Sequence, residues 1–166
     1  MSYVDTSTVV AALDLQDPRH DKALALLEKE GEKIVSEIVL AELASVVARK
    51  DEIVSSIAEK LGLNREEAII TILLYILKRF NLRLRSVEDY TRLPLLGRIY
   101  KPIAMAVELS TQAKLRTLDL LHVAYAILLK EEGEPILKLI TVDRDFEKAR
   151  ETLKKMNINL HVIARA

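Results

Sequence analysis

Four acidic residues stand where a parallel α/β sheet would gather them. Asp5 ends an apolar run near the N-terminus, and Asp143 ends a later one. Glu42 lies about one turn into the helical stretch after another apolar run, and Asp119 opens a further helical stretch. Ligands in open α/β sheets bind beyond the carboxyl ends of the strands. If the first and fourth strands are neighbours, the carboxylates therefore meet at one rim.

Such a rim is a site for a hard divalent cation. Several acids in one place repel one another unless a cation joins them. Oxygen donors suit Mg²⁺ or Mn²⁺ and argue against zinc. One or two such ions activate a water and stabilise the leaving oxygen when a phosphodiester is cleaved. The expected chemistry is metal-assisted hydrolysis.

Each acid also has a structural interpretation, which the sequence leaves open. Asp119 could favour a helix N-terminus through the macrodipole, and Asp143 could cap the helix that follows it. Glu42 could be a solvated helix residue. The structural interpretation is weakest for Asp5, because an unpaired acid at the end of a buried strand gains little there.

The apolar pattern alternates between β-rich runs and helical stretches. It predicts a single α/β domain over residues 1–166, a three-layer α/β/α arrangement with a central, mostly parallel five-stranded sheet. The expected strands are Ser2–Asp5, Lys33–Ser36, Arg83–Val87, Leu137–Val142 and Asn159–Ile163. One expected helix begins at Asp17. The others cover Ile38–Lys50, Glu52–Leu61, Arg65–Arg79, Leu96–Lys114 with a kink near Pro102, Thr117–Glu132 and Phe146–Met156. A helical pair is thus expected between the second and third strands.

Composition excludes other classes of protein. The chain contains no cysteine, which rules out a disulfide framework, a thiolate zinc site and a cysteine nucleophile. It does not open with a basic segment followed by an apolar one, and its apolar stretches are too short to cross a bilayer. We expect a cytoplasmic protein without a membrane partner.

The charge total of 25 basic against 25 acidic residues hides opposed segments. Residues 1–37 carry a net charge of −4, and residues 78–117 carry +6. A basic tract beside an acidic cluster is typical of a track for a phosphate backbone, and we expect Arg116 to contact a phosphate. Scarce aromatic residues argue against extensive base stacking. The tract contains Lys78, Arg79, Arg83, Arg85, Arg92, Arg98, Lys101, Lys114 and Arg116.

The segment Ala68–Leu77 is apolar almost all round a helix, interrupted only by Thr71. Residues 64–67 resemble a capping box that would start this helix. The helix is either buried in the core or packed with one face against a second chain. The second interpretation predicts a homodimer through the helices between Glu52 and Arg79.

Four segments together resemble the PIN domain family. They are Val4–Ser7, Ser36–Leu43, Leu118–Ala124 and Leu139–Phe146. Their order and spacing match from end to end, so the resemblance covers essentially the whole chain. PIN domains are metal-dependent ribonucleases, and small ones are often VapC-type toxins held inactive by an antitoxin. The resemblance therefore implies Mg²⁺ or Mn²⁺ as cofactor, with RNA and a cognate antitoxin as partners.

The resemblance also assigns roles to individual residues. The metal-binding, catalytic acids are Asp5, Glu42, Asp119 and Asp143. The hydroxyls that orient them belong to Thr6, Ser7 and Thr141. Asp145 either supports the acids or caps a helix, and Arg116 stands where some members carry a further acid. The implied products end in a 5′-phosphate and a 3′-hydroxyl.

Other functions stay open at this point. The chain could be a catalytically inactive PIN-like module that binds RNA or protein through its apolar helix. A phosphatase would need a second Asp at the position of Ser7, and a receiver domain would need an Asp where Val87 and Glu88 stand. His122, three residues after Asp119, is expected to pack in a helix interface rather than to face the metal.

Overall fold

The computed structural model describes residues 1–29 and 31–164. Its centre is a five-stranded, wholly parallel sheet with the order β3-β2-β1-β6-β7. The strands are β1 (Ser2–Val4), β2 (Lys33–Ser36), β3 (Leu82–Arg85), β6 (Lys138–Thr141) and β7 (Asn159–Val162). The predicted α/β class and parallel sheet are confirmed.

Strand β1 lies in the middle of this sheet. Tyr3 aligns with Ile34 of β2 on one side and with Leu139 of β6 on the other, and all three side chains are buried. Strands buried on both faces need continuous apolar runs, and the runs in the sequence located them for that reason. The expected adjacency of the first strand and the strand before Asp143 is also confirmed.

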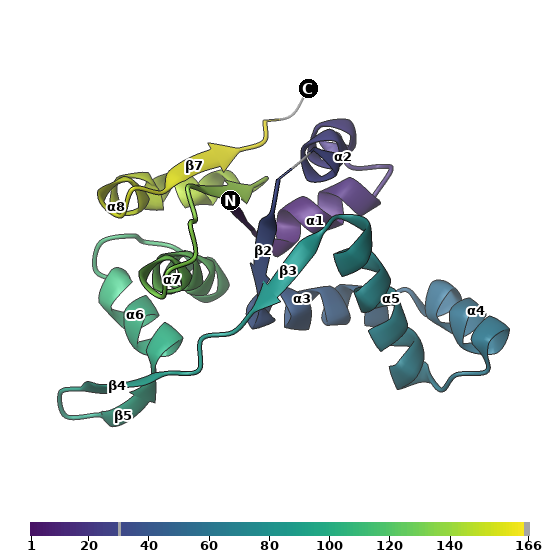
Figure 1. Cartoon of the computed structure of the whole chain (residues 1–166), viewed down its shortest axis with the longest axis horizontal. Helices are drawn as coiled ribbons and strands as arrows, with labels where there is room; N and C mark the ends of the chain where they lie inside the picture. Colours follow the sequence, from purple (N-terminus) through teal and green to yellow (C-terminus); the bar gives the residue numbers. More distant parts are fainter. Residues whose placement is uncertain (30, 165–166) are drawn as a thin grey trace.

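Helices cover both faces of the sheet. In Figure 1, α1 (Thr6–Leu13) and α2 (His20–Glu28) lie on one side, with α6 (Lys101–Leu109) and α7 (Thr117–Glu131) on the other. Every residue of α7 from Leu120 to Leu129 is buried. Over residues 1–29 and 31–164, no helix is long and apolar enough to cross a membrane.

A helical insertion follows β2. Its helices are α3 (Glu37–Ala48), α4 (Asp51–Leu61) and α5 (Arg65–Arg79), and Figure 1 shows α4 and α5 projecting from the sheet. The capping box predicted at the start of α5 is present, because Glu67 N–H donates to Asn64 Oδ1 at 3.0 Å and Asn64 N–H donates to Glu67 Oε2 at 2.9 Å. The expected helical pair between the second and third main-sheet strands is thus α4 and α5.

One expected helix is wrong in its first part. The segment predicted as a kinked helix over Leu96–Lys114 instead begins as a β-hairpin, formed by β4 (Tyr90–Leu93) and β5 (Gly97–Tyr100). Gly97 has a φ of +84°, a conformation that glycine adopts without steric cost. Pro102 lies in the first turn of α6, where its missing N–H is not needed, so it starts this helix rather than bending it.

Two further segments differ in detail. Residues 6–13 form α1, for which no helix was expected, because Asp5 accepts a hydrogen bond from the Thr8 N–H and caps it. The helix expected over Phe146–Met156 is divided into a 3₁₀ helix (Arg144–Ala149) and α8 (Arg150–Lys155).

Candidate active site

Asp5 directly follows β1 and is held by four donors. Its Oδ1 accepts from the Thr8 N–H at 3.1 Å and from Thr8 Oγ1 at 2.8 Å. Its Oδ2 accepts from Ser7 Oγ at 2.7 Å and Thr141 Oγ1 at 2.9 Å. Asp5 is only 3% exposed. The donors on both oxygens fix this carboxylate at the carboxyl end of the central strand.

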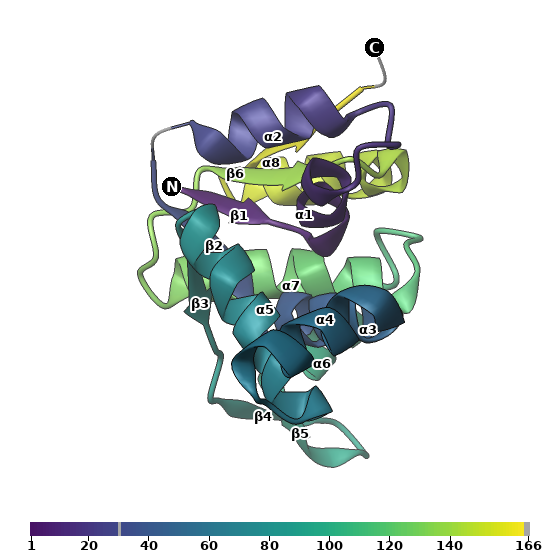
Figure 2. The ribbon, with the colours of Figure 1, turned by 90° about the vertical axis from the view of Figure 1, so that its right-hand side faces the viewer.

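Asp143 follows β6 on the same edge of the sheet. Figure 2 shows β1 and β6 side by side, with their carboxyl ends toward the start of α1. Asp143 Oδ1 accepts from the Asp145 N–H at 2.8 Å, and the Asp143 N–H donates to Thr141 Oγ1 at 2.9 Å. Asp143 therefore caps the 3₁₀ helix, as its structural interpretation expected, while it also stands on the rim.

Asp119 lies in the first turn of α7 and is poorly satisfied. Its Oδ2 is buried and has no hydrogen-bond partner within residues 1–29 and 31–164. Burial raises the pKa of Asp119, and the negative charges of Asp143 and Asp5 raise it further. The structure thus brings Asp143 and Asp5 close enough to Asp119 to oppose its negative charge.

Glu42 of α3 is held by two donors at the same oxygen. Its Oε2 accepts from Thr6 Oγ1 and from His122 Nε2, the latter at 2.9 Å. Burial works to raise the pKa of Glu42, but the hydrogen bonds from His122 and Thr6 outweigh it and hold the pKa below its usual value. Glu42 is accordingly a carboxylate at neutral pH.

A buried chain of hydrogen bonds connects Glu42 to the middle of the sheet. His122 Nδ1 lies 2.9 Å from the Tyr3 hydroxyl, which lies 2.8 Å from Ser36 Oγ. Because a carboxylate only accepts, His122 Nε2 donates to Glu42, which leaves Nδ1 for the hydrogen bond with the Tyr3 hydroxyl. The expected packing role of His122 is incomplete, since this residue is 2% exposed and also orients a carboxylate.

The site residues fit a hard cation in their chemistry. The four acids supply only oxygen donors. Asp119 Oδ2, which has no partner among the described residues, and the negative charges that oppose Asp119 favour a positive charge there. In the described part of the chain, however, no three acidic or histidine side chains converge tightly enough to hold an ion as they stand. Their assignment as metal ligands stays a prediction.

Arg19 is a neighbour of the site that the sequence did not indicate. Its guanidinium donates to both carboxylate oxygens of Asp17, at 2.6 and 2.8 Å, and to the Val142 carbonyl at 3.0 Å. A hollow of about 560 Å³ beside Asp143 is lined by this arginine, Ser7, Val142, Arg144 and Ile163. Arg19 lies in the acidic segment 1–37, so a count of charges by segment could not find it.

Two other expected site residues lie at the edge of the rim. Arg116 is exposed at the N-terminus of α7, where its charge slightly offsets the raised pKa of Asp119 and contributes weakly to the lowered pKa of Asp145. The Asp145 carboxylate bonds Lys148 Nζ at 2.8 Å, and its hydrogen bond from Lys148 lowers its pKa. The roles predicted for Thr6, Ser7, Thr141, Asp145 and Arg116 in catalysis stay predictions.

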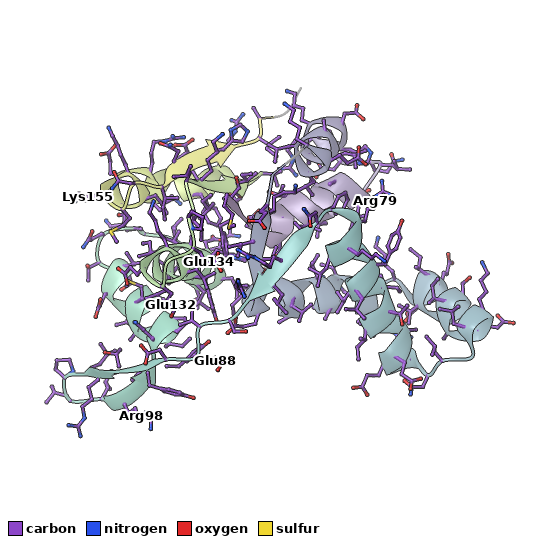
Figure 3. All side chains as sticks on the ribbon, in the orientation of Figure 1. Arg79, Glu88, Arg98, Glu132, Glu134 and Lys155 are labelled. Atoms are coloured by element: carbon purple, nitrogen blue, oxygen red, sulfur yellow. The ribbon has the colours of Figure 1, made fainter. Side chains whose placement is uncertain are left out.

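The basic tract does not form one continuous track. Arg83 and Arg85 both pair with Glu134, each at 2.6 Å, and Lys101 pairs with Asp89 at 2.9 Å. Arg79 and Arg98 lie on opposite sides of the molecule in Figure 3. The tract therefore divides into paired residues and separate exposed ones.

Solved structures with this fold include bacterial toxins. VapC20 of Mycobacterium tuberculosis, described as a Sarcin-Ricin loop cleaving toxin, has a TM-score of 0.57 and 20% identity over 90% of this chain and 95% of that one. VapBC2 of Rickettsia felis, bound to a promoter DNA fragment, has a TM-score of 0.52 and 22% identity over 99% and 100%. A toxin–antitoxin complex of Klebsiella pneumoniae has a TM-score of 0.50 and 18% identity over 88% and 90%.

These structural similarities establish the fold. No curated protein sequence matches the chain. The sequence profile of the PIN domain matches residues 2–152. That range includes β1 and β6 and all four rim carboxylates. The matched residues cover most of the sequence and the whole candidate site, and the chain belongs to the PIN domain family.

Proposed function

We propose that this chain is a Mg²⁺- or Mn²⁺-dependent endoribonuclease that acts as the toxin of a VapBC-type pair. The observation that carries the proposal is the state of Asp119. Its buried Oδ2 has no partner in the described part of the chain, and its pKa is raised by burial and by two neighbouring carboxylates. An acid that only caps the start of a helix gains nothing from a buried oxygen without a partner. A bound cation would compensate the charge of a ligand in this position.

The residues of the chain would divide the work at the rim. Asp5, Glu42, Asp119 and Asp143 would hold the cation. A bound Mg²⁺ or Mn²⁺ supplies an activated water and stabilises the leaving oxygen. Ser7 and Thr141 hold Asp5 in place, and Thr6 and His122 hold Glu42. Arg116, exposed beside Asp119, would bind a phosphate of the RNA.

Cleavage of a structured RNA in the presence of Mn²⁺ tests the proposal. Asp5→Asn should reduce cleavage at least about a thousandfold, as expected when a cation ligand is neutralised. Asp51→Asn is the matched control, because Asp51 is an exposed acid of α4 that pairs with Arg65. It should cleave at the wild-type rate. Undiminished cleavage in EDTA would contradict metal dependence.

An inactive binding module is the alternative from another class. It predicts RNA or protein binding with no heat of Mn²⁺ binding in calorimetry. The active enzyme instead predicts Mn²⁺ binding that Asp119→Asn weakens and Asp51→Asn leaves unchanged. Asp119 Oδ2, for which the described residues offer no partner, favours the enzyme.

The names of the structural neighbours suggest the substrate and the partner. One neighbour is described as cleaving the Sarcin-Ricin loop, and another is a toxin–antitoxin complex. We therefore propose a structured RNA loop as substrate and a cognate antitoxin as inhibitor. Cleavage products from such a loop should carry a 5′-phosphate and a 3′-hydroxyl.

A homodimer through α4 and α5 is part of the same proposal. Leu74 is 61% exposed on α5, near exposed Ile70 and Tyr75, and α4 adds exposed Ile53 and Leu61. Five exposed large apolar side chains on one helical pair favour an interface. Leu73, the neighbouring leucine, is only 6% exposed and packs in the core, so it is not one of these exposed side chains.

Light scattering of two leucine variants tests this interface. Leu74→Glu should convert a dimer to a monomer that keeps its fold, whereas Leu73→Glu should unfold the chain by burying a charge. A Leu74→Glu protein that scatters as a dimer would contradict the interface.

A further inference from the structure

The hairpin of β4 and β5 forms a separate two-stranded sheet that projects from the body of the molecule (Figure 1). Its register pairs Tyr90 with Tyr100 and Arg92 with Arg98. Directly opposed residues in an antiparallel pair share one face, so this face carries two tyrosines and two arginines. Tyr90, Arg92 and Arg98 are exposed on it. We call these three residues the hairpin face.

The two arginines oppose one another directly across the hairpin. Like charges directly across an antiparallel pair destabilise it. Within the described residues, neither Arg92 nor Arg98 makes a salt bridge. Asp89, at the base of the hairpin, pairs with Lys101 Nζ at 2.9 Å, and its attraction to Arg98 is weaker than its attraction to Lys101. An anion from outside the chain would relieve the repulsion between the arginines.

The third member of the hairpin face is an aromatic ring. The Arg98 guanidinium carbon lies 4.4 Å from the centre of the Tyr90 ring. Tyr90 is about half exposed at 52%. Exposed aromatic rings beside arginine are surfaces on which unpaired nucleobases stack. The hairpin face therefore offers two charges for phosphates and one ring for a base.

The hairpin tip is also unfavourable on its own. Leu95 has a φ of +67°, in the left-handed region that leucine rarely adopts, and its side chain is fully exposed. The hairpin thus combines a repulsive arginine pair with a strained, solvated leucine. Local features that oppose folding persist where they serve binding.

We propose that the hairpin face of Tyr90, Arg92 and Arg98 binds the RNA substrate away from the carboxylate rim, through phosphates and one unstacked base. This inference rests on the proposed function, since it names a second contact of the same substrate. Figure 2 shows the hairpin turn on the side toward which β1 and β6 point. The hairpin packs against α6, and α6 packs against α7, so a folded RNA bound at the rim can reach the hairpin across these two helices.

Binding of a labelled stem–loop RNA to the full chain in EDTA tests the charges. Arg92→Ala combined with Arg98→Ala should weaken binding at least about tenfold. The slope of log affinity against log salt should become shallower by about 1.4, because each lost phosphate contact to a single strand removes about 0.7. Lys154→Ala combined with Lys155→Ala removes the same charge from α8, far from Arg98 in Figure 3, and should change neither quantity.

Two substitutions at one position test the stacking ring. Tyr90→Leu should weaken RNA binding about fivefold or more, with the salt slope unchanged. Tyr90→Phe keeps the aromatic ring and should bind as the wild type does.

Each contrary result has a distinct meaning. Wild-type affinity in the double arginine variant, or an equal loss in the lysine control, would overturn the hairpin proposal. Equal binding of poly-glutamate, lost in the same arginine variant, would assign the face to an acidic protein and would also overturn it. Cleavage of the same stem–loop RNA by the wild type in Mn²⁺ separates the two proposals. A wild type that binds this RNA but does not cleave it contradicts the nuclease and leaves the hairpin contact standing, whereas a cleaving wild type whose arginine variant binds equally well contradicts the hairpin contact alone.

Discussion

Asp5 and Asp119 lie on the same rim of the sheet, yet the hydrogen bonding of their carboxylate oxygens differs. Asp5 accepts from four donors, and three of them belong to Ser7 and Thr8, two and three residues later in the chain. Asp119 has a buried oxygen without a partner in residues 1–29 and 31–164, and its charge is opposed by its neighbours. One carboxylate is fixed by the fold, and the other is left unfavourable by it.

The difference indicates how the site divides stability and function. The α1 side is a structural unit, because the carboxylate of Asp5 caps α1 and joins it to β6 through Thr141. Asp119, in the first turn of α7, lowers the stability of the metal-free fold because its charge is buried and opposed. A bound cation would reverse that effect. In the proposed nuclease, this loss of stability is the usual trade-off between stability and activity. The following substitutions test whether the two sides really differ.

The largest effect is expected at Asp5. Asp5→Ala removes a helix cap and leaves the Thr8, Ser7 and Thr141 hydroxyls without their acceptor, so the free energy of unfolding should fall by about 2–4 kcal/mol. Urea denaturation of the metal-free protein measures this loss. Asp51→Ala, at an exposed acid, should change it by less than about 0.5 kcal/mol. An Asp5→Ala protein as stable as the control would contradict the role of Asp5 in stabilising the fold.

The acid positions on the rim were predictable from sequence, and their surroundings were not. Asp5 and Asp143 each end a buried apolar run, and parallel topology fixes such run ends at one edge. The bonds from His122 to Glu42 and to Tyr3 join residues 80 and 119 positions apart. No spacing rule encodes such pairs, because they depend on how α7 packs against β1 and α3.

The hairpin shows a second limit of sequence reasoning. Its strands Tyr90–Leu93 and Gly97–Tyr100 are four residues each and stand next to a true helix. The apolar residues between Leu93 and Leu96 fit a helical pattern as well as a turn. Leu95 and Gly97 close the turn with positive φ values. A glycine in the sequence indicates that such a φ is possible, but a leucine does not.

The second effect is expected at Asp119, with the opposite sign. Asp119→Asn should raise the free energy of unfolding of the metal-free protein by about 0.5–2 kcal/mol, the usual gain when an unfavourable functional group is removed. Mn²⁺ should raise the melting temperature of the wild type but have little effect on this variant. A destabilised Asp119→Asn protein would contradict the unfavourable state of this carboxylate.

The pH dependence of that gain follows from the sign of the pKa shift. Burial, and then the charges of Asp143 and Asp5, raise the pKa of Asp119 in the folded chain. The folded chain therefore holds this proton more tightly than the unfolded chain does. The penalty is absent below the ordinary carboxyl pKa and complete above the raised one. The advantage of Asp119→Asn should accordingly be full at neutral pH and shrink toward about pH 4, as urea midpoints in EDTA would show.

The smallest effect is expected at Tyr3, which links the centre of the sheet to Glu42 through His122. Tyr3→Phe removes the hydroxyl between Ser36 Oγ and His122 Nδ1 and should cost about 1 kcal/mol of stability. Tyr125→Phe is a matched control, because this tyrosine is equally buried and its hydroxyl lies 3.2 Å from that of Tyr100 instead. Both variants should lose similar stability. Only Tyr3→Phe should weaken Mn²⁺ binding, by about tenfold, since only that hydroxyl orients the histidine that holds Glu42. Equal Mn²⁺ affinity in the two variants would show that the chain from Tyr3 to Glu42 serves packing alone.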